Sequence, residues 1–369
     1  MTSSRYTIPD LPSVDELLPY LRQIDENRWY TNHGPLSREF EARLATHLNK
    51  RDAASQQGPI WLVSVSTGHH ALVIAMRLLR LPKRAQVLVP SVTFPSSAFA
   101  IEEAGAVPVF TDIDPTNWSL TPEIARKIAS RRKVDAVMTV AVYGVPVTGW
   151  DAFTKETGIP VVIDAAAALD VQPVPEHGLV AHSMHATKPF GIGEGGLLAS
   201  RDPAIIQTAR EMSNFGTRER IAYDCGMNAK LSEYHAAVAL AQLDRWQGIK
   251  DRRRNVFNSY VKALAEHGLT SGLQKDIDQA VTSCLMLKLQ KPEAQRVVEA
   301  LNAKGISAHR CYWPPLPHHP HFADAEKAEP LRNAEELNHL IMGLPFHAFM
   351  TEEEVTDTVR LVVEEISRG

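Results

Sequence analysis

Cysteine is scarce in this chain of 369 residues, and Cys225, Cys284 and Cys311 lie far apart. An odd number of cysteines at these spacings forms neither a disulfide framework nor a zinc site, which favours a reducing compartment. The chain also lacks an apolar run long enough to cross a bilayer, and its first ten residues lack the apolar segment of a secretory signal. These absences predict a cytoplasmic protein with no membrane segment.

Net charge is also low, at −4, which gives no general attraction to nucleic acid or to an anionic membrane. Two short basic runs, at residues 131–133 and 252–254, are interpreted as solvated helix faces. The histidines at 318, 319 and 321 have no acidic or cysteine partner at a ligand spacing, so we expect no metal. The 44% hydrophobic content is that of a globular protein long enough for two lobes.

Apolar runs alternate with helical patterns through the middle of the chain, which indicates a mostly parallel sheet covered on both faces. Two helices are expected before this sheet, over Val14–Ile24 and Ser37–Leu48, and one long helix after it, from Ser232 to about Leu264. Seven strands are expected, at Trp61–Val65, Gln86–Pro90, Pro108–Thr111, Ala136–Val142, Val161–Asp164, around His182–His185, and at Gly196–Ser200.

The pattern changes after Cys225 and predicts a smaller α+β lobe at the C-terminal end. It should contain a strand at Cys284–Leu289, a helix ending at Gly305, and a last helix that begins with the capping box at Thr351–Glu354. We therefore expect an α/β fold in two parts. Residues 1–245 would form the N-terminal segment and the large domain, and residues 246–369 the smaller domain.

Lys188 is the last residue of the most informative motif, Ser-Met-His-Ala-Thr-Lys. A glycine-rich turn follows this motif. The apolar strand Val161–Asp164 ends in an acid shortly before it. A lysine amine that can form a Schiff base and an acid for a pyridine nitrogen together suit pyridoxal 5′-phosphate. The alternative for Asp164 alone is a carboxylate that caps the next turn.

Three further residues are candidates for holding this cofactor. Gly68 lies where a strand turns into a helix, a setting in which backbone N–H groups bind phosphate, although a plain turn is the alternative. Ser183, five residues before Lys188, could donate to the same phosphate. Phe94 follows another strand and could stack on the pyridine ring, or it could simply belong to the core.

The order of these motifs resembles the DegT/DnrJ/EryC1/StrS family of pyridoxal phosphate-dependent sugar aminotransferases, which have aspartate-aminotransferase fold type I. Ser66–Leu72 is similar to the family's phosphate turn, and Asp164-Ala-Ala to its Asp-Ala-Ala signature. Ser183–Lys188 with Gly193–Gly196 resembles its lysine motif and glycine turn, and residues 226–232 its Gly-Tyr-Asn-Tyr-Arg-Leu-Ser segment. The resemblance runs from about residue 34 to residue 361.

The resemblance implies that Lys188 is the Schiff-base lysine and that Asp164 pairs with the pyridine nitrogen. Phe94 would stack, while Gly68, His69 and Ser183 would hold the phosphate. Asn228 would reach the cofactor of a second subunit, making the enzyme a homodimer with shared active sites. The other interpretation of Asn228 is a turn residue that tolerates left-handed backbone.

The implied reaction transfers an amino group from an amino acid, glutamate being expected, to a nucleotide-linked keto-sugar in amino-sugar biosynthesis. The cofactor would alternate between pyridoxal and pyridoxamine phosphate. Departures from the family pattern are Ala167 for Gln or His, His69 for Thr, Ala141 for His and Lys230 for Arg. The first three of these departures keep open a non-catalytic cofactor-binding regulator. A sugar dehydratase of the same family is a further alternative, but those members resemble the motif with His in place of Lys188.

Overall fold

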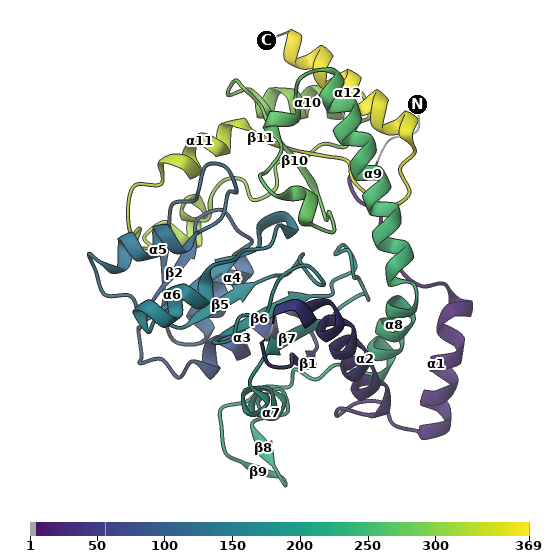
Figure 1. The fold of residues 1–369 in the computed structure, drawn as a ribbon, viewed down its shortest axis with the longest axis vertical. Helices are drawn as coiled ribbons and strands as arrows, with labels where there is room; N and C mark the ends of the chain where they lie inside the picture. Colours follow the sequence, from purple (N-terminus) through teal and green to yellow (C-terminus); the bar gives the residue numbers. More distant parts are fainter. Residues whose placement is uncertain (1–4, 56, 369) are drawn as a thin grey trace.

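A seven-stranded sheet lies at the centre of the computed structural model, which describes residues 5–55 and 57–368 (Figure 1). The strands lie in the order β1-β7-β6-β5-β4-β2-β3, and within this sheet β7 alone runs antiparallel to its neighbours. This arrangement confirms the predicted mostly parallel sheet. The strands are β1 (Trp61–Val65), β2 (Gln86–Pro90), β3 (Val107–Thr111), β4 (Ala136–Val140), β5 (Val161–Asp164), β6 (Gly178–Ser183) and β7 (Gly196–Ser200).

Helices cover both faces of the sheet, as expected when parallel strands are joined by helical crossovers. One face packs against α2 (Pro35–Asp52), α5 (Pro122–Ala129), α6 (Trp150–Thr157) and α8 (Glu233–Asp244). The opposite face packs against α3 (Gly68–Leu78), α4 (Pro95–Glu103) and α7 (Pro203–Met212). The N-terminal helix α1 (Val14–Asn27) is capped by Ser13 in a capping box and lies along α8.

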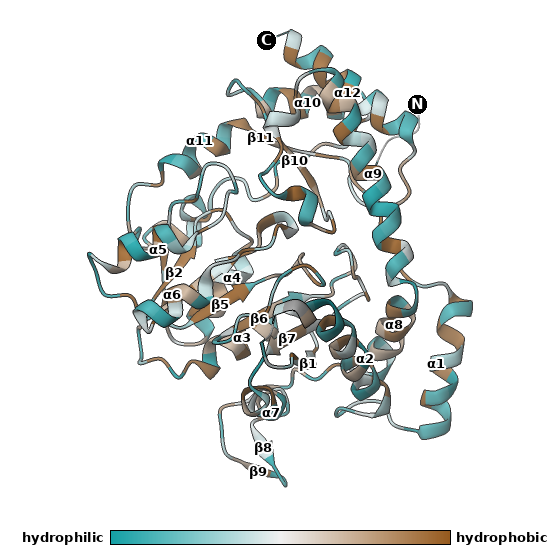
Figure 2. Cartoon of the chain, in the orientation of Figure 1, coloured by the Kyte–Doolittle hydropathy of each residue, from teal (hydrophilic) through white to brown (hydrophobic). Residues whose placement is uncertain are grey.

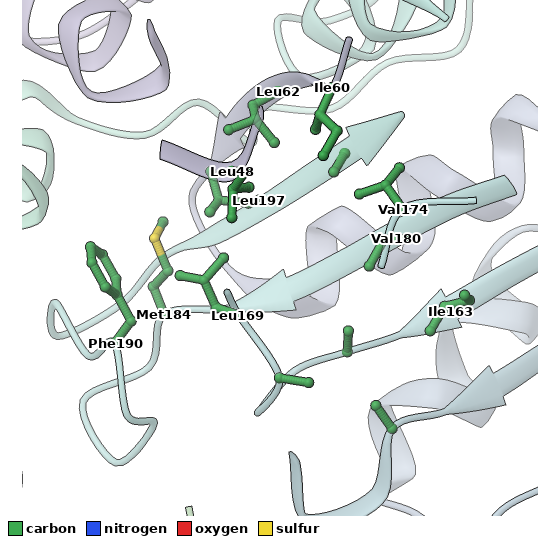
Figure 3. Packing of buried hydrophobic residues seen from close by; sticks show 14 of the residues in the cluster. Leu48, Ile60, Leu62, Ile163, Leu169, Val174, Val180, Met184, Phe190 and Leu197 are labelled. Carbon is green, nitrogen blue, oxygen red and sulfur yellow. The ribbon is translucent and has the colours of Figure 1, made fainter. Parts of the chain in front are cut away.

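Successive residues of the central strands point into different cores. In β5, Val161 and Ile163 belong to the core beneath α2, whereas Val162 belongs to the core beneath α3. Figure 3 shows the α2 side, where Ile163, Val180 and Leu197 from the neighbouring strands β5, β6 and β7 belong to the same core. In Figure 2 the buried strand β5 is coloured mainly hydrophobic, whereas α1 carries both hydrophobic and hydrophilic residues.

A third, smaller core lies beyond the sheet in the C-terminal part of the chain. It joins the antiparallel pair β10 and β11 to the long helix α9 and the helices α10 and α12. Tyr6, near the N-terminus, also reaches this part, where its carbonyl accepts from the N–H of Phe346 at 2.9 Å. The elements are α9 (Trp246–Glu266), β10 (Leu285–Lys288), α10 (Ala294–Ala303), α11 (Arg332–Leu340), β11 (Ile341–Leu344) and α12 (Glu352–Ser367). The expected division at residues 245 and 246 stays a prediction.

Several predicted boundaries were wrong. The strand expected at Ala136–Val142 is β4 and ends at Val140, because the chain turns tightly over Val142–Gly144. The strand expected around His182–His185 is β6 (Gly178–Ser183), and it ends where the chain enters the turn, in which the Met184 carbonyl accepts from the Ile192 N–H at 2.9 Å rather than from a residue of β7. The single helix expected from Ser232 to about Leu264 is two helices that meet at Arg245. Trp246 directs its ring into the core there, and its Nε1–H donates to Asp170 at 3.0 Å.

No helix in the described part of the chain combines the length and the apolar character that a membrane crossing requires.

Candidate active site

A cavity of about 590 Å³ opens where β4, β5 and β6 end and α3 begins. Ligands of open α/β sheets bind at such carboxyl ends, and cavities of this size accommodate small molecules. The structure brings six of the seven predicted site residues to its wall, and these are Gly68, His69, Phe94, Asp164, Ser183 and Lys188. Residues that lie as much as 120 positions apart in the sequence therefore meet in one place, which turns the separate motifs into one site.

Lys188 lies in the turn between β6 and β7, and two buried side chains of this turn fix it to the core. Phe190 is buried and packs between Phe40 and Trp246, with ring centroids 6.0 and 5.2 Å away. Met184, also buried, anchors the start of the turn (Figure 3). Within residues 5–55 and 57–368, the Lys188 amine has no hydrogen bond or ion pair. The fold therefore holds an unpaired amine at the wall of the cavity.

Asp164 ends β5 as a buried carboxylate, with 5% of its surface exposed. Ser97 Oγ–H donates to it at 2.7 Å, and the Ala166 N–H donates at 3.1 Å. Thr93 Oγ1 lies 2.9 Å from Ser97 Oγ and extends the network. Burial raises the pKa of the Asp164 carboxyl, while both hydrogen bonds and the Lys188 charge oppose that rise. A cation bound beside this carboxylate would stabilise its charged form.

Gly68 is the first residue of α3, whose N-cap Thr67 accepts from the His70 N–H at 3.1 Å. A Cβ on Gly68 would lie 2.7 Å from the Cβ of Ser183, so only glycine lets α3 begin against β6. The first N–H groups of a helix have no intrahelical acceptor, and they carry the positive end of the helix dipole. The start of α3 beside Ser183 is therefore suited to a phosphate.

His69 and Phe94 reach the cavity in different ways. Both imidazole nitrogens of His69 are engaged, with Ser96 Oγ at 2.7 Å and Glu103 Oε1 at 2.9 Å. Its backbone N–H, rather than its imidazole, is the group placed for an anion. Phe94 precedes α4 and is 60% exposed although it lines the cavity, so one ring face is open to a ligand.

Asn228 does not line this cavity. It is exposed, its Oδ1 accepts from Lys230 Nζ at 2.7 Å, and its backbone bridges to Asn214. The hairpin of β8 (Thr217–Arg218) and β9 (Ile221–Ala222) precedes it and projects from the body of the molecule (Figure 1). In its own chain, Asn228 is therefore exposed and is not one of the residues that line the cavity.

The departures from the family pattern also lie in the wall. Ala141 and Ala167 are buried there, so the positions that hold polar side chains in the pattern are apolar. Sequence reasoning missed Ser97, Thr93 and Tyr312. Thr93 and Ser97 are four residues apart around the start of a helix, a spacing that could have suggested a shared direction. Tyr312 lies in a loop for which no site role was predicted.

Comparison with known proteins gives the family. The family model described as the DegT/DnrJ/EryC1/StrS aminotransferase family matches residues 13–363. The chain belongs to this family. Family membership confirms the predicted pyridoxal phosphate-dependent aminotransferase and its fold type.

Individual relatives match along nearly the whole chain. "Protein MT3510" of Mycobacterium tuberculosis is 31% identical, covering 98% of this chain and 90% of its own. A dTDP-4-amino-4,6-dideoxy-D-glucose transaminase of Shigella dysenteriae is 26% identical over 96% and 97%. A dTDP-3-amino-3,4,6-trideoxy-α-D-glucose transaminase of Streptomyces venezuelae is 28% identical over 100% of both chains. The crystal structure of a putative PLP-dependent aminotransferase of Bacillus cereus has a TM-score of 0.89 and 28% identity over 98% and 99%.

The residues of the cavity fit pyridoxal phosphate in three respects. The Lys188 amine is unpaired, and the buried Asp164 carboxylate suits a protonated ring nitrogen. The start of α3, where a Cβ at Gly68 would collide with Ser183, leaves backbone N–H groups for the phosphate. The altered positions 141 and 167 remove polar contacts from the wall but leave these three features intact.

Proposed function

We propose that the protein transfers an amino group from an amino acid, expected to be glutamate, to a nucleotide-linked keto-sugar. The observation that carries the proposal is the joint position of Lys188 and Asp164 in one cavity above the start of α3. The names of the Shigella and Streptomyces relatives, both dTDP-amino-sugar transaminases, support the sugar as the acceptor.

The assignments of the individual residues follow from their positions. Pyridoxal phosphate, when bound, supplies an electron sink that makes a substrate C–H bond acidic. The Lys188 Nζ would hold the cofactor covalently and, when released, would carry the proton between the two carbons that exchange it. Asp164, oriented by Ser97, would keep the ring nitrogen protonated.

The phosphate and the ring need contacts of their own. The N–H groups of Gly68 and His69 and the hydroxyl of Ser183 would bind the phosphate, and Phe94 would cover the ring. Asn228 is proposed to contact the phosphate in a second subunit, so the active unit would be a homodimer. Its exposure and its absence from its own chain's cavity support this assignment.

The proposal is tested with the amino sugars of the two relatives, dTDP-4-amino-4,6-dideoxy-D-glucose and dTDP-3-amino-3,4,6-trideoxy-α-D-glucose. Each is incubated with holoenzyme and 2-oxoglutarate, and glutamate formation is measured for this reverse reaction. We expect formation of glutamate with a nucleotide sugar and none when Lys188 is replaced by Ala.

The outcomes separate the alternatives. A holoenzyme that binds the cofactor but neither consumes glutamate nor forms it with a wider panel of nucleotide amino sugars would support a regulator. A keto-sugar that loses a hydroxyl group without gaining nitrogen would support a dehydratase. Either result would overturn the proposed transamination.

A further inference from the structure

Tyr312 enters the cavity from a different part of the chain than its other lining residues. In the described part of the chain, the other residues that line the cavity lie between Thr67 and Glu194. Tyr312 instead belongs to the loop that follows α10 in the C-terminal part. In the described part of the chain, its hydroxyl has no hydrogen bond. A polar group that lines a ligand cavity and lacks a partner is available to a ligand.

The surroundings fix the position of this side chain. The ring of Tyr312 stacks on that of Tyr143, with centroids 5.1 Å apart and planes 14° apart. The Tyr143 hydroxyl donates to the carbonyl of Cys311 at 3.2 Å, and the Cys311 thiol lies 3.0 Å from the hydroxyl of Tyr6. Further along the loop, the Leu316 N–H donates to Ser91 O at 2.9 Å, which ties it to the large lobe.

The backbone of this pair is unusual as well. Tyr312 and Tyr143 both have a φ of 57°, in the left-handed region that bulky residues rarely adopt. Such conformations cost about 1–3 kcal/mol each and persist where the surrounding structure enforces them, often at functional sites. Two strained tyrosines stacked at one cavity therefore indicate that the location of the Tyr312 hydroxyl matters.

The chemistry of the Tyr312 hydroxyl limits the class of ligand that it can bind. Burial raises the pKa of the Tyr312 hydroxyl well above its usual value, so it stays a neutral hydrogen-bond donor at physiological pH. The carboxylates of an amino acid donor are bound best by cations such as arginine. A neutral hydroxyl beside an aromatic ring and the apolar Ala141 and Ala167 instead suits a sugar, which has hydroxyl or keto oxygens and apolar C–H faces.

We propose that Tyr312 is a substrate-binding residue whose hydroxyl donates to an oxygen of the sugar acceptor, while Tyr143 holds its ring in place. This inference rests on the proposed function, because it assigns the residue to one of the two half-reactions. It predicts that removing the hydroxyl weakens sugar recognition and leaves the amino acid half-reaction intact.

The test compares Tyr312→Phe with wild type in separate half-reactions. The first is 2-oxoglutarate release from glutamate, and the second is turnover of whichever amino sugar or keto-sugar wild type accepts. We expect less than a threefold change in the first. In the second we expect kcat/KM to fall about tenfold, the effect of one hydrogen bond, chiefly through KM.

A binding measurement provides a readout independent of turnover. In calorimetric titration of the pyridoxamine phosphate form, with which an amino sugar cannot react, Tyr312→Phe should raise the Kd of the nucleotide amino sugar about tenfold, while the Kd of the nucleoside diphosphate alone should not change. Tyr234→Phe is the matched control, since its exposed ring stacks on Tyr30 outside the cavity and should behave as wild type.

The possible results distinguish a failure of the role proposed for Tyr312 from a failure of the proposed function. If wild type turns over a sugar and Tyr312→Phe equals it in both half-reactions and in Kd, the role of Tyr312 is wrong. An equal loss in both half-reactions would also overturn it, because the residue would then serve the whole site. If wild type releases 2-oxoglutarate from glutamate but accepts no sugar, the proposed function fails instead.

Discussion

Replacing Gly68 by Ala should separate the start of α3 from β6 and weaken cofactor binding. The new Cβ would lie 2.7 Å from the Cβ of Ser183 and 2.9 Å from its Cα, closer than carbon atoms normally approach. Because one of these atoms belongs to a sheet strand, the helix start must move. Overpacking of this kind costs about 1–3 kcal/mol of folding free energy.

The effect on the cofactor follows from the same displacement. A hydrogen bond to a charged group contributes about 1.5–3 kcal/mol, so losing one N–H contact to the phosphate should raise the Kd of pyridoxal phosphate roughly ten- to hundredfold. Kd is measured by titrating the apoenzyme, and stability by urea unfolding of the same preparation.

Gly58→Ala is the matched control, because a Cβ at Gly58 would meet nothing within 4 Å. We expect this variant to keep the wild-type Kd and stability. If Gly68→Ala matched Gly58→Ala in both measurements, α3 would not be held against Ser183 as described, and the phosphate would have to bind elsewhere.

Three further predictions concern chemistry, assembly and pH. Asp164→Asn should still bind the cofactor but lose at least about a thousandfold in kcat, about 4 kcal/mol of barrier, and a loss below tenfold would place the ring-nitrogen partner elsewhere. Mixing inactive Lys188→Ala with inactive Asn228→Ala subunits should restore activity, because one site of the mixed dimer carries neither lesion; no recovery with heterodimers present would contradict a shared site. Burial lowers the pKa of His182 to about 4, so this imidazole is neutral in the fold but takes up a proton near pH 6.5 when unfolded. Its contribution to stability is complete above about pH 6.5 and is lost as the pH falls toward 4, so His182→Phe should lose less unfolding free energy than wild type between pH 7 and pH 5.

The sheet was largely predictable because most of its strands are short apolar runs that turn residues delimit. β5 ends at Asp164 and β7 at Ser200 as expected. The boundaries of β6 and of the helix from Ser232 were predicted wrongly because the local sequence pattern continues past the point where tertiary contacts end the element. Met184 continues the apolar sequence of β6, but its carbonyl accepts from the Ile192 N–H within the turn. Trp246 is compatible with a helix but directs its ring toward Asp170.

The site was predictable to the extent that its residues lie in continuous motifs. Lys188 and Gly68 lie in such motifs, each next to a glycine turn or a strand end. The partner of Asp164 was not predictable, because Ser97 lies 67 positions away in the sequence and reaches it from α4, which packs on β2 and β3. Tyr312 depends on how the C-terminal loop meets the large lobe, which no short motif encodes.

The most direct test of the central claim is the location of the covalent cofactor. Holoenzyme is reduced with borohydride, digested and examined by mass spectrometry for the lysine that carries the pyridoxyl phosphate mass. The label should be on Lys188, persist in Lys230→Ala and disappear in Lys188→Ala. Label on another lysine, or wild-type turnover by Lys188→Ala, would contradict the assignment of this cavity as the active site.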